Sequence, residues 1–196
     1  MLSEDAFNSL LVRERSRHPA VILSPALLLI DFQRYFTDRE SPAYLKGIEN
    51  AMDRTAELID IFSQCRMPVA ITVHKGGSPM MREWWGNSVE EPWIFSEFKG
   101  FPTFAKNGYD AFYGTDLEAF LESKGVNQLV ICGVMTHLCC ETTARSAFVR
   151  GYRIIMVEDG LCDKSISYHV CSLKSLSHGF ASVARSGEIV ELLERR

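Results

Sequence analysis

Three residues of this 196-residue chain have reactive side chains, and two of them stand where the chain is predicted to leave a β-strand or to enter a helix. Asp31 directly follows an apolar run, Lys106 lies in the segment FAKNGYDAF, and Cys139 follows ICGVMTHL and opens a predicted helix. Taken singly, such an Asp usually caps a turn, such a Lys is usually solvated and such a Cys usually packs in the core. Together, a thiol nucleophile, a carboxylate base and an ammonium are suited to attack on a carbonyl group.

The position of Cys139 at a helix N-terminus favours the reactive thiolate. A helix start presents unpaired N–H groups and a partial positive charge. Such sites lower the pKa of a thiol from its ordinary value of roughly 8.5. Lys106 would lower it further and Asp31 would accept the proton. We therefore expect the Cys139 thiol to have a pKa below its ordinary value if the three side chains meet.

The elements that must position these residues alternate between strand and helix along the chain. Apolar runs without alternation predict strands buried on both faces, and apolar spacing of three to four residues predicts helices. The predicted strands are 26–31, 68–73, 128–133, 153–158 and 182–184, and the predicted helices are 3–16, 50–65, 116–124, 139–150 and 167–180. The segment 75–100 is interpreted as a long functional loop.

This alternation predicts an α/β domain with a mostly parallel sheet and right-handed crossovers. In such sheets, ligands bind beyond the carboxyl ends of the strands. Asp31 and the turn before Cys139 are both expected at that edge.

Composition and charge argue against several classes of function. The net charge is -4, with no dense cluster of Lys and Arg, so nucleic acid is not an expected partner. The longest apolar stretch, 20–30, is interrupted by Ser24 and Pro25 and is too short to span a bilayer. The first 18 residues are charged and lack the apolar core of a secretory signal. We therefore expect a cytoplasmic protein whose six cysteines are free thiols.

Four segments, in order, resemble the isochorismatase-like hydrolases. GVMTHLCCETTA, residues 133–144, resembles their G-x-x-T-x-x-C-x-x-x-T-A signature, and ALLLIDFQRYF resembles their first strand with its catalytic aspartate. KNGYDAFYGTDLEAFL resembles their lysine segment, and SLKSLSHGFASVARSGEIVELL resembles the usual end of the domain. The resemblance implies a single three-layer α/β/α domain over residues 21–196, with a mostly parallel six-stranded sheet. Residues 1–20 are expected to form a helical extension.

The resemblance also implies the parts of a catalytic site. Asp31, Lys106 and Cys139 would form the triad, and the backbone N–H groups of Met135 and Cys139 would form the oxyanion hole. A cis peptide bond is expected at Val134–Met135. Aromatic residues are expected to line the substrate pocket, namely Phe36, Trp84, Trp85 and Tyr109.

Two departures from family patterns narrow the expected activity. Nicotinamidases of this family bind a metal through an Asp-x-His pair and further histidines, whereas TVHKGGSPMMREWWGNS contains only His74. The resemblance therefore implies no metal and no other cofactor, and it disfavours nicotinamide as the substrate. Isochorismatases, which REWWGNS and KNGYDAF also resemble, commonly carry Gly where this chain has Cys139, and Cys140 matches the cysteine that follows.

The retained thiol favours hydrolysis of a C–N bond in a small amide, ureide or carbamoyl substrate through a thioester acyl-enzyme. The first alternative is vinyl-ether hydrolysis with Asp31 as the acid. The second is a non-catalytic binding protein on the same fold. His137 is interpreted as a hydrogen-bonded histidine at a turn, and the resemblance implies a homo-oligomer.

Overall fold

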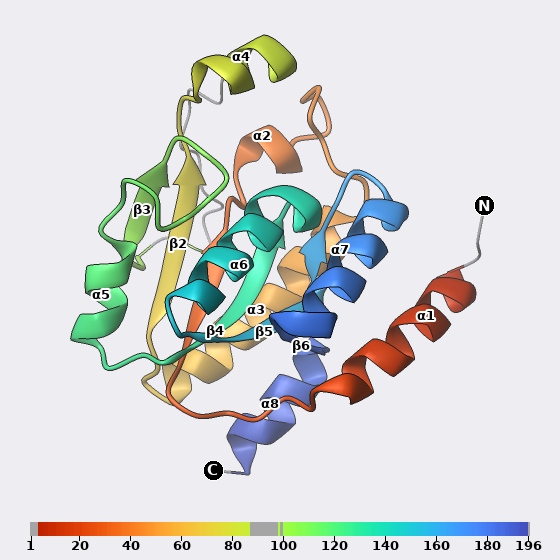
Figure 1. Cartoon of the computed structure of the whole chain (residues 1–196), viewed down its shortest axis with the longest axis vertical. Helices are drawn as coiled ribbons and strands as arrows, with labels where there is room; N and C mark the ends of the chain where they lie inside the picture. The colour runs from red at the N-terminus through yellow and green to blue at the C-terminus, as the bar shows by residue number, and fades with distance from the viewer. Residues whose placement is uncertain (1–3, 87–97, 99, 196) are drawn as a thin grey trace.

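One sheet of six parallel strands forms the centre of the molecule (Figure 1). The computed structural model describes residues 4–86, 98 and 100–195. The strands are β1 (Pro25–Ile30), β2 (Val69–His74), β3 (Thr103–Lys106), β4 (Gln128–Val134), β5 (Arg153–Cys162) and β6 (Ser182–Ala184). They run across the sheet in the order β3-β2-β1-β4-β5-β6, and every neighbouring pair is parallel. A sheet of this order opens a ligand crevice beyond the carboxyl ends of β1 and β4, where the strand order reverses.

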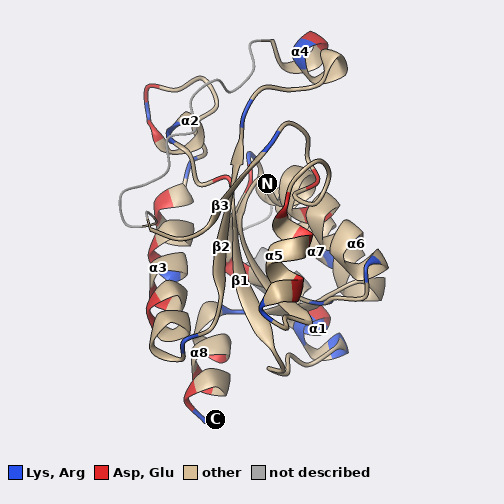
Figure 2. Ribbon diagram, turned by 90° about the vertical axis from the view of Figure 1, so that its left-hand side faces the viewer, with Lys and Arg blue, Asp and Glu red and all other residues tan. Residues whose placement is uncertain are grey.

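Helices cover both faces of the sheet and complete a three-layer α/β/α arrangement (Figure 2). On one face lie α3 and α8, and on the other lie α5, α6 and α7, with α1 packed against α7. The helices are α1 (Glu4–Arg17), α2 (Arg34–Thr37), α3 (Ile48–Gln64), α4 (Pro79–Trp85), α5 (Leu117–Ser123), α6 (Glu141–Val149), α7 (Ile166–Gly179) and α8 (Ser186–Glu194). This architecture confirms the predicted single-domain α/β fold. Within the described residues, no helix has both the length and the apolar character needed to cross a bilayer.

Several elements near the carboxyl edge of the sheet differ from the sequence prediction. The structure has a strand at β3 that the sequence does not predict. TFAK is an edge strand with only its last residue buried, so it lacks the continuous apolar run by which buried strands are predicted. The sequence also predicts a loop where α4 lies. This helix is capped by the Ser78 hydroxyl, which accepts the Met81 N–H at 3.2 Å, but none of its side chains is buried. Without a buried face it lacks the apolar periodicity by which helices are predicted.

The predicted helix 139–150 begins three residues early. A π-helical turn, η2 (Thr136–Cys140), leads directly into α6. A single π-helical turn of this kind is rare and is often found at functional sites. Cys139 therefore lies inside the turn and not at the open start of an α-helix.

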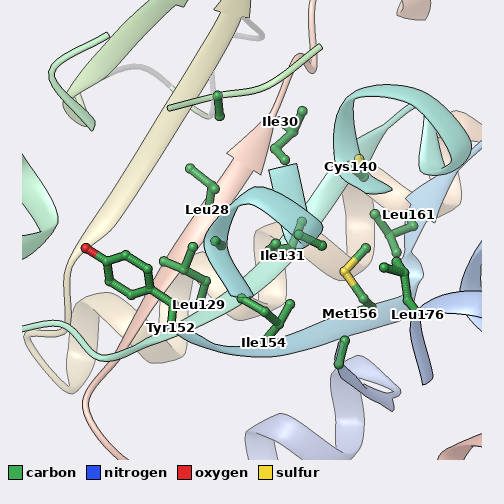
Figure 3. Packing of buried hydrophobic residues seen from close by; sticks show 14 of the residues in the cluster. Leu28, Ile30, Leu129, Ile131, Cys140, Tyr152, Ile154, Met156, Leu161 and Leu176 are labelled. Atoms are coloured by element: carbon green, nitrogen blue, oxygen red, sulfur yellow. The ribbon is translucent and has the colours of Figure 1, made fainter. Parts of the chain in front are cut away.

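Both faces of the central strands are packed in apolar cores. Every residue of β1 and β4 is buried, and successive side chains point to opposite faces. Leu28 and Ile30 belong to the core under α6 and α7, whereas Leu27 and Leu29 belong to the core under α3. Figure 3 shows the first of these cores, with Leu28, Ile30, Leu129, Ile131, Ile154 and Met156 projecting from three neighbouring strands. Each such side chain stabilises the fold by roughly 1.5–3 kcal/mol on burial, so the sheet is a rigid support for its edge.

Gly133 brings the ends of β1 and β4 unusually close together. Its φ is +136°, and a Cβ atom built on it would lie 2.2 Å from the carbonyl oxygen of Ile30. Any larger residue would therefore push the end of β1 away from β4. This close approach sets Asp31, which follows β1, beside the turn that follows β4.

Helix α1 is held on the body by apolar and polar contacts. Leu11 is buried in the core under α6 and α7. The buried carboxylate of Glu14 accepts a hydrogen bond from the Ser177 hydroxyl at 2.7 Å, and Arg15 pairs with Glu158. The predicted helix 3–16 is therefore observed from Glu4 onward; Ser3, which the sequence places at its N-terminus as a possible cap, lies outside the described residues.

Candidate active site

Asp31, Lys106 and Cys139 meet beyond the carboxyl ends of β1, β3 and β4. The Lys106 ammonium nitrogen lies 2.6 Å from Asp31 Oδ2 and donates a hydrogen bond to Cys139 Sγ at 3.2 Å. All three residues are buried. The three predicted residues are therefore neighbours, as a common site requires.

Edge strand β3 places the ammonium between the other two groups. Lys106 is its last residue and is paired in register with His74 of β2. Besides its contacts with Asp31 and Cys139, Lys106 Nζ donates to the Gly108 carbonyl oxygen at 3.0 Å and lies 3.3 Å from His74 Nδ1. This set of neighbours holds the side chain in one position.

The site contains three groups that could in principle ligate a metal. A carboxylate oxygen of Asp31, a ring nitrogen of His74 and the sulfur of Cys139 all lie within 4.8 Å of one another. The Lys106 ammonium nitrogen lies within 3.3 Å of an atom of each of them. A metal at bonding distances of about 2.0–2.3 Å would have to displace this ammonium. The donors are therefore better suited to hold a lysine cation than a metal ion.

The two oxygens of Asp31 have different surroundings. Oδ1 accepts a hydrogen bond from the Thr72 hydroxyl at 2.8 Å. Oδ2 is buried and, apart from the Lys106 ammonium, has no hydrogen-bond partner among the described residues. The backbone of Asp31 adopts a left-handed conformation with φ +56°, which is uncommon for a residue other than glycine and recurs at functional sites. Oδ2 therefore keeps a lone pair available for a proton from the neighbouring thiol.

Burial controls the protonation of the thiol and the ammonium. Loss of hydration raises the pKa of Cys139 to about 12, which the Lys106 charge opposes and the Asp31 charge increases. Burial lowers the pKa of Lys106, but the charges of Asp31 and Cys139 raise it more, so its pKa lies above the ordinary value. At rest the site therefore contains a neutral thiol and a charged ammonium.

The expectation of a lowered pKa for Cys139 is wrong for this resting site. The expectation assumes an open helix start, whereas Cys139 lies within η2, where the N–H of Cys140 already donates to the Met135 carbonyl at 3.2 Å. A helix terminus contributes typically about 0.3–1 kcal/mol. Full burial of a thiolate costs more than that.

Met135 presents a free backbone donor at the same place. Its peptide bond with Val134 is cis. Among the described residues the Met135 N–H has no hydrogen-bond partner, while its carbonyl accepts from the N–H groups of Leu138 and Cys140. Met135 and Cys139 both line the pocket. A free N–H of a residue that lines this pocket can stabilise negative charge on a substrate oxygen that reaches it.

A pocket of about 310 Å³ opens in front of Cys139. Three of the predicted wall residues, Phe36, Trp85 and Tyr109, line it, and Trp85 Nε1 donates to the Tyr109 hydroxyl at 2.7 Å. Trp84 does not line it and is 70% exposed, which corrects that expectation. Neighbouring residues on a helix point about 100° apart, so only one of the two tryptophans faces the pocket.

Sequence reasoning gave no role at this site to His74, Thr72 or Gln33. The backbone N–H of His74 donates to Gln33 Oε1 at 2.6 Å, and Gln33 Nε2 donates back to the His74 carbonyl at 3.0 Å. Burial and then the Lys106 charge lower the pKa of His74, which leaves a neutral imidazole beside the ammonium. Thr72 and His74, two polar residues at the end of β2, were the signal in the sequence that could have indicated this role, because the end of β2 lies next to the end of β1.

His137 is hydrogen-bonded, as its interpretation as a turn residue requires. Its N–H donates to Asp163 Oδ2 at 2.8 Å, and its Nδ1 lies 2.7 Å from the same oxygen. Its ring stacks on Tyr168 with centroids 4.3 Å apart. Asp163 therefore ties the end of β5 to η2, a role that the sequence did not predict.

A parallel α/β sheet of this strand order, with a buried carboxylate, ammonium and thiol at its carboxyl edge, defines the class of isochorismatase-like hydrolases. The family model of the isochorismatase domain matches residues 25–188. The chain belongs to this family and is an isochorismatase-family hydrolase.

Several known proteins are similar to the chain over most of its length. Nicotinamidase 3 from Arabidopsis thaliana is 35% identical over 170 residues, which cover 80% of this chain and 82% of the plant protein. Enterobactin synthase component B from Escherichia coli is 31% identical over 84% of this chain and 60% of its own length. Among solved structures, a cysteine hydrolase from Pseudomonas syringae has a TM-score of 0.83 at 20% identity, covering 91% of this chain and 98% of its own. An N-carbamoylsarcosine amidase from Thermoplasma acidophilum has a TM-score of 0.72 at 24% identity, covering 84% and 97%. These two structural matches show the fold.

Proposed function

We propose that the protein hydrolyses a C–N bond of a small amide, ureide or carbamoyl compound, with Cys139 as the nucleophile. The observation that carries the proposal is the Lys106 ammonium, 2.6 Å from a carboxylate and 3.2 Å from a thiol at a pocket wall. Similarity to a nicotinamidase and to the fold of an N-carbamoylsarcosine amidase supports this kind of reaction. The resting thiol holds its proton, so the mechanism must remove that proton as the substrate is attacked.

In the first half of the reaction, Asp31 acts as the general base. Its Oδ2 takes the thiol proton while the sulfur of Cys139 attacks the carbonyl carbon. The C=O electron pair moves onto oxygen, where the Met135 N–H stabilises the negative charge. Lys106 stays protonated and stabilises the thiolate that forms. Because proton transfer accompanies attack, a free thiolate need not accumulate.

Collapse of this intermediate breaks the C–N bond. The electron pair returns from oxygen, the nitrogen leaves, and Asp31 returns the proton to it, which releases ammonia or an amine. The acyl group remains on Cys139 as a thioester. Asp31 then takes a proton from water, whose oxygen attacks the thioester, and the departing sulfur regains its proton. Asp31 and Lys106 end the cycle in their starting states.

A mass-spectrometric search for the acyl-enzyme tests this proposal. Wild-type protein is mixed with a panel of small amides, ureides and N-carbamoyl compounds, nicotinamide included, and quenched in acid during turnover. We expect an adduct of the acyl mass on the peptide that contains Cys139, together with release of ammonia or amine. Turnover that persists in Cys139→Ala but not in Asp31→Ala would overturn it in favour of vinyl-ether hydrolysis. Binding without turnover across the panel would favour a binding protein.

A further inference from the structure

The described lining of the pocket carries charge of one sign only. Arg82 of α4 and Lys164, which follows β5, are its charged residues, and no described carboxylate lines it. Most other lining side chains are aromatic or aliphatic. The buried pair of Asp31 and Lys106 is not part of this lining and already neutralises itself. A ligand in the pocket is therefore exposed to positive charge against an apolar background.

Neither cation has a counter-charge among the described residues. Arg82 donates from Nε to the Gly77 carbonyl oxygen at 3.1 Å, and the Lys164 side chain has no hydrogen bond or ion pair there. Several other arginines of the chain are paired with carboxylates, as Arg34 is with Asp38 and Arg145 is with Glu141. Both side chains are exposed to solvent, but they lie on the lining of one small apolar pocket, where a negatively charged group of a ligand can pair with them.

The backbone of Lys164 is tied to the turn that carries the nucleophile. The buried carboxylate of Asp163 accepts the Lys164 N–H at 2.7 Å through one oxygen and the His137 N–H at 2.8 Å through the other. His137 lies two residues before Cys139 in η2. One carboxylate therefore ties the backbone at Lys164 to the turn that carries Cys139, and a fixed backbone at this place helps to orient a substrate.

We propose that the substrate is a small amide or carbamoyl compound that also carries a carboxylate, which Lys164 and Arg82 bind while the scissile group faces Cys139. This inference rests on the proposed function, because it places the scissile group at the thiol. The pocket of about 310 Å³ lies at the small end of the usual range of ligand pockets. A neutral amide of the same size would leave both cations unpaired, so the pocket discriminates by charge.

Binding of two matched probes, succinamate and succinamide, tests the inference. Both carry a primary amide on the same four-carbon chain, and only succinamate has a carboxylate. Dissociation constants are measured by calorimetry on Cys139→Ala, which removes turnover, with Lys164→Gln and Arg82→Gln added singly and together. Arg153→Gln, at the opposite end of β5, removes an equal charge outside this pocket and is the control.

We expect succinamate to bind about 10-fold or more tightly than succinamide, as for a hydrogen-bonded charge pair. The double variant should remove most of this difference, Arg153→Gln should retain it, and added salt should weaken succinamate alone. Equal dissociation constants, preference for succinamide or no binding of either probe would overturn the inference. So would variants that weaken both probes equally, because the two residues would then only shape the pocket.

The two proposals fail in different ways. Selective binding of succinamate, with no thioester formed by wild type on any amide acid, would leave the charge selectivity standing and remove the C–N hydrolase. Thioester formation on neutral amides, with no effect of ligand charge on binding, would support the C–N hydrolase and overturn the charge selectivity.

Discussion

Replacement of Lys106 by methionine removes the charge that neutralises Asp31 while keeping a side chain of similar length. The two charged groups lie 2.6 Å apart, and both side chains are fully buried. The matching change, Asp31→Asn, removes the other charge and keeps a residue that tolerates a left-handed backbone. Together the two variants isolate the interaction between the charges.

The expected losses of stability follow from burial. Breaking a buried pair by removing one partner typically costs about 3–5 kcal/mol, because the remaining charge has neither solvent nor partner. Each single variant should therefore lose roughly this much free energy of unfolding. The double variant leaves no unpaired charge and should be more stable than the sum of the single losses allows, with a coupling free energy of about 3 kcal/mol.

Equilibrium unfolding in urea, followed by circular dichroism, measures these free energies. The exposed pair Arg34–Asp38, at 2.9 Å, is the control, and the cycle of Arg34→Met and Asp38→Asn should give a coupling of at most about 0.5 kcal/mol. A coupling free energy at Asp31–Lys106 no larger than this control value would refute the inference that the two residues form a stabilising buried ion pair. All three buried-pair variants should also lose turnover.

Four further outcomes are expected. Cys139→Ala should lower turnover by roughly 10⁴-fold or more in a steady-state assay, because it removes the nucleophile. Replacement of Cys140, which is also buried but does not line the pocket, by alanine should leave turnover within a few fold, and equal losses in the two variants would contradict the assignment of Cys139 as the nucleophile. Burial lowers the pKa of His169 to about 4. The unfolded chain therefore binds more protons between about pH 6.5 and 4, and His169 should lower the stability over that window by up to about 3 kcal/mol in urea unfolding. The fall should be clearly smaller in His169→Gln, where only other groups such as His74, whose pKa is also lowered, contribute. Gly133→Ala should lower the urea midpoint and turnover together, because its Cβ would lie 2.2 Å from a backbone oxygen of β1; unchanged values would show that the strands can separate freely. Exhaustive chelation should leave turnover unchanged, since Lys106 occupies the space between the possible ligands; restoration of lost activity by zinc or iron would contradict this.

The fold was predictable because its main elements have strong local signals. The apolar runs that became β1, β2 and β4 are buried on both faces, which a parallel sheet between helix layers requires. β3 and α4 were missed because half-exposed elements lack such a signal. That miss affects function, since β3 carries Lys106 and α4 carries Arg82 and Trp85.

The candidate reactive groups were also visible in the sequence, as residue types after strands and in motifs shared with a known family. Asp31, Lys106 and Cys139 could be named because each motif is local. Their meeting at one point depends on strand order, which only the folded sheet has. The register of β2 with β3 sets His74 opposite Lys106, and no spacing in the sequence states it.

The sequence determined which chemical groups are present, and the tertiary structure decided their protonation and surroundings. From sequence, the pKa of Cys139 was expected to lie below its ordinary value; burial raises this pKa instead, because desolvation depends on every atom packed around the sulfur. The positive charge of the described pocket lining is likewise a property of the fold. Arg82 and Lys164 are 82 residues apart in the chain, and only the return of the chain to one edge of the sheet brings them to the same cavity.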